Sequence, residues 1–219
     1  MLEEFVDNND YWNNFYKNSN IDLIHAPSSF AIFCKENYIQ KKSVLVEIGS
    51  GNGRDSFYFA KHGHKVHAID LSQEAVNLEK KVIEQKLEDN ICLINDNFVT
   101  YDYNKIENID IFYSRFTMHT INESEEIILL EKIYTALKIG GEYFVEARTI
   151  NDPLIKEGKK ISQNEMYTDH YRRFLNSGDF LKKCLKLGFE LKYFTEKSGL
   201  SIYKNDDPVL LRMILKKVI

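Results

Sequence analysis

Residues 44–55 read VLVEIGSGNGRD, an apolar stretch that runs into three alternating glycines and then into a helical pattern. Glycine lacks a Cβ atom, so a loop of this composition can turn sharply and bring its backbone close to a bound molecule. The helix expected to begin near Arg54 adds backbone N–H groups that have no partner within the helix. The stretch therefore predicts a ligand-binding loop between a strand and a helix.

The next expected strand ends at a carboxylate, Asp70, which can accept hydrogen bonds from the hydroxyls of a ribose. The loop does not fit a dinucleotide fingerprint, because Arg54 stands where G-x-G-x-x-G requires its third glycine. Glu47, two residues before the first glycine, would repel a pyrophosphate and attract a cationic amine. These residues predict a nucleoside ligand that carries an amine and no phosphate. S-adenosylmethionine has this combination of groups, together with a sulfonium.

The glycine loop and Asp70 together resemble motifs I and II of the class I S-adenosylmethionine-dependent methyltransferases, and the resemblance covers residues 44–147. Two positions depart from the family pattern, with Ile139 in place of a usual proline and Asn97 in place of a frequent aspartate. An asparagine oxygen can still accept a hydrogen bond from an adenine amino group. The resemblance implies S-adenosylmethionine as cofactor, with S-adenosylhomocysteine as its product.

The cofactor site that we expect combines the N-terminal helix, the glycine loop and the carboxyl ends of the second, third and fourth strands. Its residues are Tyr11, Glu47, Gly49, Gly51, Asn52, Gly53, Arg54, Asp55, Asp70, Leu71, Asp96, Asn97, Phe98, Ser114 and Arg115. We predict no metal site.

Apolar runs of strand length alternate with helical patterns, which is typical of an α/β fold with helices on both faces of a parallel sheet. Strands are expected at 44–48, 65–69, 91–94, 109–114 and 142–147, and helices at 54–62, 73–87 and 124–138. A helix at 177–187 then precedes strands at 189–196 and 209–217, which a short connection should join as an antiparallel hairpin. The resemblance implies a Rossmann-like seven-stranded sheet of order 3-2-1-4-5-7-6 with the seventh strand antiparallel.

We expect a single domain over residues 1–219, because no Gly/Ser-rich linker divides the chain. Its parts would be an N-terminal helical cap or lid (1–40), a donor-binding core (41–147), a substrate-side insertion (148–176) and a C-terminal helix and β-hairpin (177–219). The state of association could be a monomer or a homodimer.

The composition is that of an ordinary globular protein, with 43% hydrophobic and 28% charged residues. A net charge of −4 gives no general reason to bind nucleic acid. The cysteines Cys34, Cys92 and Cys184 form no C-x-x-C pair, so we interpret them as core residues in a reducing compartment. No apolar run approaches the ~20 residues that span a bilayer, and we expect a cytoplasmic protein.

Two segments outside the core are expected to choose the methyl acceptor. The N-terminal segment carries Tyr11 and Tyr16 with helical spacing, so it either packs its aromatic side on the domain or covers the donor as a lid. The insertion concentrates positive and aromatic side chains that could bind the acceptor. Together with Tyr16 and Arg115, the predicted acceptor-binding residues are Arg148, Tyr171, Arg172 and Arg173.

Guanidiniums that converge on a cleft suit a phosphate or a carboxylate, so these arginines predict a small anionic acceptor. If Arg172 and Arg173 lie on a helix, they point about 100° apart and cannot both face one pocket. A hydroxyl acceptor would need a base, for which His119 is the first candidate and His170 the second. An acceptor that is already ionised would need none.

The segments Tyr-Ser-Arg-Phe-x-x-His at 113–119, His-Tyr-Arg-Arg-Phe at 170–174 and Asp-Asp-Pro-Val at 206–209 resemble small bacterial methyltransferases from surface-polysaccharide gene clusters, including capsular ones. The core is also similar to tellurite-resistance and thiopurine-type methyltransferases. We therefore favour O-methylation of a sugar phosphate, a phosphoramidate or a carboxylate. A nucleic-acid or protein methyltransferase, and a non-catalytic S-adenosylmethionine-binding protein, remain the alternatives.

Overall fold

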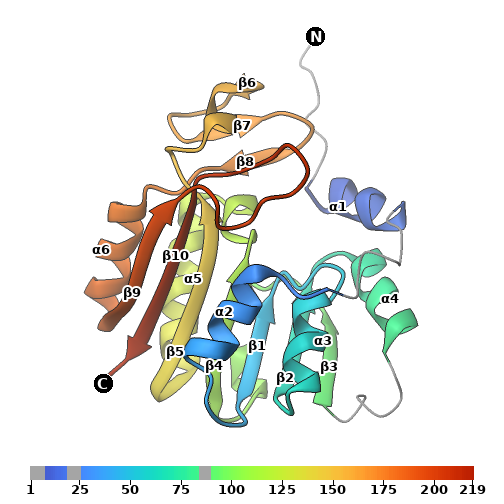
Figure 1. Ribbon diagram of the computed structural model, residues 1–219, viewed down its shortest axis with the longest axis vertical. Helices are drawn as coiled ribbons and strands as arrows, with labels where there is room; N and C mark the ends of the chain where they lie inside the picture. The colour runs from blue at the N-terminus through green and yellow to red at the C-terminus, as the bar shows by residue number, and fades with distance from the viewer. Residues whose placement is uncertain (1–7, 19–25, 84–89) are drawn as a thin grey trace.

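The computed structural model describes residues 8–18, 26–83 and 90–219. Its centre is a seven-stranded sheet of order β3-β2-β1-β4-β5-β10-β9 (Figure 1). The strands are β1 (Val44–Ile48), β2 (Lys65–Asp70), β3 (Ile91–Asn95), β4 (Ile109–Arg115), β5 (Leu137–Arg148), β9 (Phe189–Lys197) and β10 (Leu210–Lys217). β10 runs antiparallel to both β5 and β9, whereas β1 to β5 pair in parallel. The predicted fold class and strand order are confirmed.

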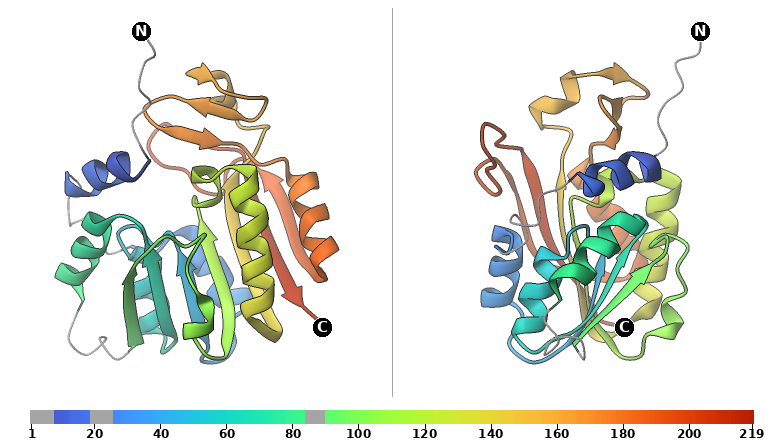
Figure 2. Two further views of the ribbon diagram at one scale, coloured as in Figure 1. Left: turned by 180° about the vertical axis from the view of Figure 1, so that it is seen from behind. Right: turned by 90° about the vertical axis from the view of Figure 1, so that its right-hand side faces the viewer.

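Helices cover both faces of this sheet (Figures 1 and 2). They are α2 (Ser29–Asn37), α3 (Arg54–Lys61), α4 (Gln73–Val82), α5 (Glu123–Ala136) and α6 (Ser177–Leu187), while α1 (Asn8–Lys17) lies beyond the carboxyl edge against α4 (Figure 1). Alternate residues of β1 supply two cores, because Leu45 faces the core under α2 and α3 while Val46 and Ile48 face the core under α5 and α6. The sheet is thereby buried on both faces, as parallel sheets require.

Short polar side chains begin most of these helices. Ser28 caps α2 and Ser72 caps α4, each by accepting a hydrogen bond from a backbone N–H three residues later. α5 begins with a full capping box, in which Asn122 and Glu125 each accept from the other's backbone N–H. Asn122 is therefore the N-cap of α5.

Some predicted boundaries are wrong. β5 begins at Leu137 rather than at residue 142, because Leu137 pairs with Ile109 ahead of a register shift in the β4–β5 ladder. α4 ends at Val82, and the predicted end at residue 87 lies outside the described residues. The connection between β9 and β10 runs from residue 198 to residue 209 and is not a short turn. Cys92 is exposed on the edge strand β3, whereas Cys34 and Cys184 are buried as predicted.

The insertion at 148–176 folds into a small antiparallel sheet that sequence patterns did not predict. Its strands are β6 (Lys159–Lys160), β7 (Glu165–Tyr167) and β8 (Tyr171–Arg173). In both views of Figure 2 this small sheet lies above the carboxyl edge of the main sheet, with α1 beside it. Arg172 and Arg173 therefore lie on a strand and not on a helix, although neighbouring side chains of a strand also point to opposite faces. The structure describes no helix that is long and apolar enough to cross a membrane.

Candidate functional site

A cavity of about 870 Å³ opens at the carboxyl edge of the main sheet, between the glycine loop, α1 and the small sheet. This edge is where ligands bind in open α/β sheets. The predicted site residues that line it are Tyr16, Glu47, Gly49, Gly51, Asn52, Arg54, Asp55, Asp70, Leu71, Asn97, Phe98, Arg115, His119 and Tyr171. Most of the predicted cofactor residues are thus brought together at one place.

The glycines of the loop adopt left-handed backbone conformations, and the loop packs closely against neighbouring side chains. Gly49 and Gly51 have φ values of +68° and +60°, which side-chain-bearing residues rarely adopt. A Cβ atom on Gly49 would lie 2.6 Å from the hydroxyl of Thr117, and one on Gly51 would strike the hydroxyl of Tyr16. Thr117 is fixed there by donating to the carbonyl of Ile48 at 2.8 Å. The loop backbone therefore lies directly at the cavity surface.

Asp70 ties the end of β2 to this loop. Its Oδ2 accepts from the backbone N–H of Gly51 and its Oδ1 from that of Ser72, each at 2.8 Å. Burial raises the pKa of Asp70 to about 6, against the lowering effect of these two hydrogen bonds. Each carboxylate oxygen has a second acceptor position, so the group can still receive the hydroxyls of a ribose.

Glu47, near the end of β1, lies on the other side of the loop. Its carboxylate is 4% exposed and accepts a hydrogen bond from the hydroxyl of Ser56. Burial, followed by the charge of Asp55, holds the pKa of Glu47 well above its ordinary value. A ligand with positive charge would relieve both effects. The chemistry of this set of residues therefore fits S-adenosylmethionine, which brings an amine and a sulfonium.

A third carboxyl group, Glu79 on α4, lies behind the loop and was not predicted. Its Oε1 accepts from the hydroxyl of Ser50 at 2.6 Å, and a Cβ atom on Gly53 would lie 2.7 Å from its Cδ atom. The side chain is fully buried, and burial raises its pKa to about 8. No sequence signal marks Glu79, because a glutamate within a lysine-rich helix normally indicates a solvated face.

α1 spans the cavity and contacts both of its sides. Tyr16 brings its buried hydroxyl to Gly51 on the donor side. Tyr11 points the other way, donating to Asp169 at 2.6 Å and stacking on His170 with ring centroids 4.2 Å apart. Tyr11, predicted to bind the cofactor, is not among the cavity-lining residues, whereas Tyr16, predicted to bind the acceptor, lines the cavity at the glycine loop.

The two candidate bases have different surroundings. His119 lines the cavity, and its pKa is held well below the ordinary value by burial and then by the charge of His170. His170 is 2% exposed and lies beneath Tyr11, outside the cavity lining. Burial and then the charge of Arg172 lower the pKa of His170 to about 4. Both imidazoles are therefore neutral near pH 7, and His119 is the one that a ligand can reach.

Of the four predicted acceptor-binding arginines, only Arg115 reaches the cavity. Arg148 is bound by Asp152 and Asp206, and Arg172 is bound by Asp169 and Thr168. Arg173 is buried, donates to the carbonyl of Ile121 and pairs with Glu126. These three side chains belong to the framework around the site.

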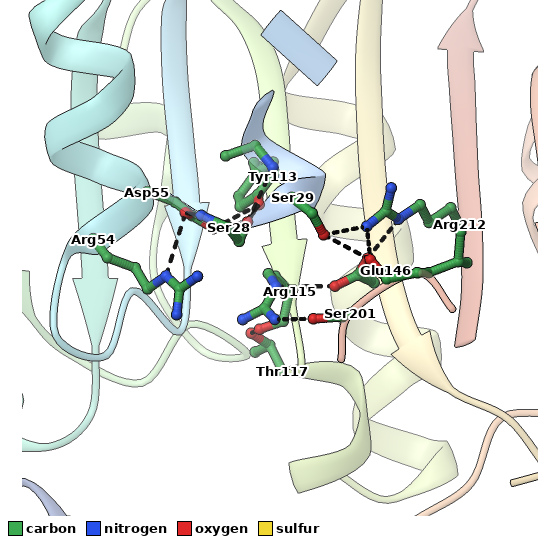
Figure 3. Close-up of polar contacts among 12 residues, drawn as sticks. Ser28, Ser29, Arg54, Asp55, Tyr113, Arg115, Thr117, Glu146, Ser201 and Arg212 are labelled. Atoms are coloured by element: carbon green, nitrogen blue, oxygen red, sulfur yellow. Dashed lines mark hydrogen bonds and ion pairs between the residues drawn. The ribbon is translucent and has the colours of Figure 1, made fainter. Parts of the chain in front are cut away.

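Arg115 lies at the end of β4, beside the cavity (Figure 3). Its Nε donates to Glu146 at 2.9 Å, and one terminal nitrogen donates to Ser201 at 2.7 Å. Arg212 donates to the other oxygen of Glu146 at 2.6 Å, so one buried carboxylate serves two guanidiniums. This group joins β4, β5, β10 and the β9–β10 connection.

The remaining predicted cofactor residues differ in whether they reach the cavity. Asn97 lines it, while its side-chain oxygen accepts from the backbone N–H of Val99 at 2.8 Å. Ser114 is buried against the hydroxyl of Tyr143. Gly53 and Asp96 are likewise absent from the lining.

The far end of the cavity is lined by residues that the sequence patterns did not select. They come from α1, the segment after β4, the first turn of α5 and the small sheet. These residues are Trp12, Phe116, Glu125, Ile161, Glu165 and Tyr167. Phe116 has φ +53°, a strained value for an aromatic residue, and such strain is often found at functional sites.

Residues 45–141 match the family model described as a methyltransferase domain. The ribosomal protein L11 methyltransferase of Listeria monocytogenes serotype 1/2a (strain 10403S) is 29% identical over 154 residues, which are 66% of this chain and 46% of that protein. A probable cobalt-precorrin-6B C(15)-methyltransferase of Methanobrevibacter smithii is 29% identical over 137 residues, 61% of this chain and 70% of that protein. The chain thus spans about half the length of the L11 methyltransferases that it matches.

Solved structures of methyltransferases share the fold. The glycopeptide N-methyltransferase MtfA bound to S-adenosylhomocysteine superposes with a TM-score of 0.69 at 14% identity, covering 88% of this chain and 90% of that one. MtfA has also been solved with S-adenosylmethionine. The CcbJ methyltransferase of Streptomyces caelestis gives a TM-score of 0.72 at 12% identity, covering 97% of this chain and 100% of that one.

Proposed function

We propose that the protein is a class I S-adenosylmethionine-dependent methyltransferase that transfers a methyl group to a small molecule, and the match of residues 45–141 to a methyltransferase domain supports this. The observation that most supports this proposal is the cavity that Glu47, Asp70 and the glycine loop line together. Its volume of about 870 Å³ is in the range of small-molecule sites, and α1 and the small sheet lie over it.

Bound S-adenosylmethionine supplies an electrophilic methyl group on a sulfonium. The protein's part is to bind and align the two partners and to accept a proton. Glu47 suits the amine of the donor and Asp70 suits its ribose, while the loop backbone lies close enough to contact it. Phe116 and Thr117 follow β4, where the acceptor would approach the methyl group.

His119 is the side chain that we propose as the base. It lines the cavity and is neutral near pH 7, so it can accept a proton from an acceptor hydroxyl or amine. His170 would act only through its contact with Tyr11. Substitution of His119 by glutamine should leave donor binding unchanged and slow turnover of a hydroxyl or amine acceptor by about a hundredfold.

An anionic acceptor is a second candidate, and Arg115 is the observation that favours it. Its guanidinium shares Glu146 with Arg212, so this buried group carries an excess of positive charge beside the cavity. A sugar phosphate, phosphoramidate or carboxylate could bind there. A part in surface-polysaccharide modification stays a prediction from the sequence resemblance.

The test is transfer of radiolabelled methyl groups. The purified protein is incubated with methyl-labelled S-adenosylmethionine and a cell extract, which is then separated into small-molecule, protein and nucleic-acid fractions. We expect the label in the small-molecule fraction, and its loss with His119→Gln would support the base assignment. Label in protein would favour an activity like that named for the L11 relatives. Label in no fraction would contradict the proposed activity.

A further inference from the structure

The far end of the cavity differs in chemistry from the end formed by the glycine loop. Two carboxylates, Glu125 and Glu165, line it together with the aromatic side chains Trp12 and Tyr171. Two arginines line the cavity of the described structure, Arg54 beside Asp55 and Arg115 beside Glu146, and the charge of Arg115 also acts on Glu47 at the donor end. Arg115 already donates to Glu146 and Ser201.

Glu165 is held in position by its neighbour in the small sheet. The hydroxyl of Tyr171 donates to its Oε1 at 2.6 Å across the antiparallel β7–β8 pair. Burial, followed by this hydrogen bond, raises the pKa of Tyr171, so the phenol keeps its proton and remains the donor. The carboxylate therefore presents its remaining acceptor positions from a fixed place.

Glu125 is fixed in a different way. It is the third residue of α5, and its Oε2 accepts from the backbone N–H of Asn122 at 2.9 Å within the capping box. Its charge also acts on the hydroxyl of Tyr171, as does the opposite charge of Arg173, so both carboxylates and this guanidinium lie around the same phenol. Two fixed negative charges thus face one space.

The two nearby arginines each have a carboxylate partner outside this pair, although Arg173 is opposite Glu165 in the β7–β8 ladder. Arg173 is committed to Glu126 and to a backbone carbonyl, and Arg172 is committed to Asp169. Aromatic faces and carboxylates attract the same kind of ligand group, a cation. The wall formed by Trp12 and Tyr171 adds apolar surface on which the body of such a ligand can pack.

We infer that the acceptor is a small amine with an apolar or aromatic body, bound as an ammonium between Glu125 and Glu165. This inference rests on the proposed methyltransferase function and names its substrate class. The ammonium gives up one proton through His119 to solvent. The nitrogen lone pair then forms the new N–C bond as the C–S bond breaks and its electron pair returns to sulfur. The products are a methylated ammonium and S-adenosylhomocysteine.

The test compares three small probes of similar shape and different charge on protein saturated with S-adenosylhomocysteine. The probes are benzylamine, benzyl alcohol and benzoate, and their dissociation constants are measured by ligand-observed NMR. We expect benzylamine to bind about tenfold more tightly than the other two, as a charge-assisted contact allows. Glu165→Gln and Glu125→Gln should each remove most of this preference.

Glutamine keeps the size of both side chains, and at position 125 it can still complete the capping box. Glu157→Gln is the matched control, since Glu157 is exposed in the same insertion and outside the cavity lining. Equal binding of the probes, no binding of benzylamine, a preference for benzoate, or an amine preference that survives both substitutions would overturn the inference. Binding of S-adenosylhomocysteine itself reports on the proposed function. If it fails, the same probes on the protein alone still test the charge of the cavity.

Discussion

Three carboxyl groups lie around one glycine loop, and burial sets their protonation. The pKa of Asp70 is raised to about 6 and that of Glu79 to about 8, while that of Glu47 is raised well above its ordinary value. A cationic ligand stabilises the ionised forms of such groups. The loop is therefore ready to receive positive charge, which agrees with the donor that we propose.

Glu79 should make the stability of the protein depend on pH. Its folded pKa of about 8 lies above the unfolded value near 4.5, so the folded state binds more protons between these values. Stability should therefore fall as the pH rises through this window. We expect Glu79→Gln to reduce the loss of unfolding free energy between pH 6 and pH 8 by about 2 kcal/mol. Urea unfolding of both proteins at the two pH values checks this, and equal pH dependence would contradict it.

Glu47 and Asp70 could be recognised from the sequence because each stands at a fixed distance from the glycines, at the end of a strand. Glu79 could not, because its role depends on how α4 packs behind the loop. The arginines illustrate the opposite error. Their charge suggested a ligand, but Arg148, Arg172 and Arg173 are satisfied by carboxylates distant in the chain or on the neighbouring turn.

Among the elements, α1 is held by contacts near the surface: it packs against α4, and Tyr11 and Trp12 contact the ring of His170. None of its residues is buried. Asn13 accepts from Ser72 on the donor side, and on the other side Asn8 donates to the carbonyl of Thr120 and Tyr11 donates to Asp169. A helix that is held by polar and ring contacts near the surface opens more easily than a helix that buries side chains in the hydrophobic core.

Tyr11→Phe should therefore loosen α1 while leaving the main sheet intact. We expect faster amide exchange within residues 8–17 and unchanged exchange in β1 and β4, as measured by hydrogen–deuterium exchange. Tyr203→Phe is the control, since Tyr203 is exposed on the β9–β10 connection. Unchanged exchange in α1 would mean that other contacts hold the helix.

In the small sheet, Arg173 and Arg172 should respond differently to substitution. Arg173→Ala removes a buried guanidinium from Glu126, which is 1% exposed and keeps Lys183 as a partner. It also removes the bond to the Ile121 carbonyl, so we expect a cost of about 2 kcal/mol. Arg172 pairs with an exposed carboxylate, so Arg172→Ala should cost about 1 kcal/mol or less. Chemical denaturation measures both values. A similar cost for the two variants would show that the Arg173 pair contributes no more than a surface contact.

For the molecule as a whole, the alternation of strands and helices predicted a parallel α/β sheet with helices on both faces. The resemblance to class I methyltransferases implied its seven strands and their order, and the structure confirms both. The pattern could not predict the three-stranded sheet at 159–173, because its strands are only two or three residues long and show no usable period. The acceptor end of the cavity depends on this sheet and on α1. This is why a larger share of the predicted donor-binding residues than of the predicted acceptor-binding residues lines the cavity.

The central claim is that the cavity beside Asp70 binds the methyl donor, and calorimetric titration with S-adenosylhomocysteine tests it most directly. We predict micromolar binding to the wild-type protein, no binding of NAD, and at least tenfold weaker binding to Asp70→Ala, which loses the ribose contact and the bond to Gly51. Asp179→Ala, at an exposed position on α6, should bind like the wild type. Unchanged affinity in a folded Asp70→Ala protein, or binding of NAD in place of S-adenosylhomocysteine, would contradict the account.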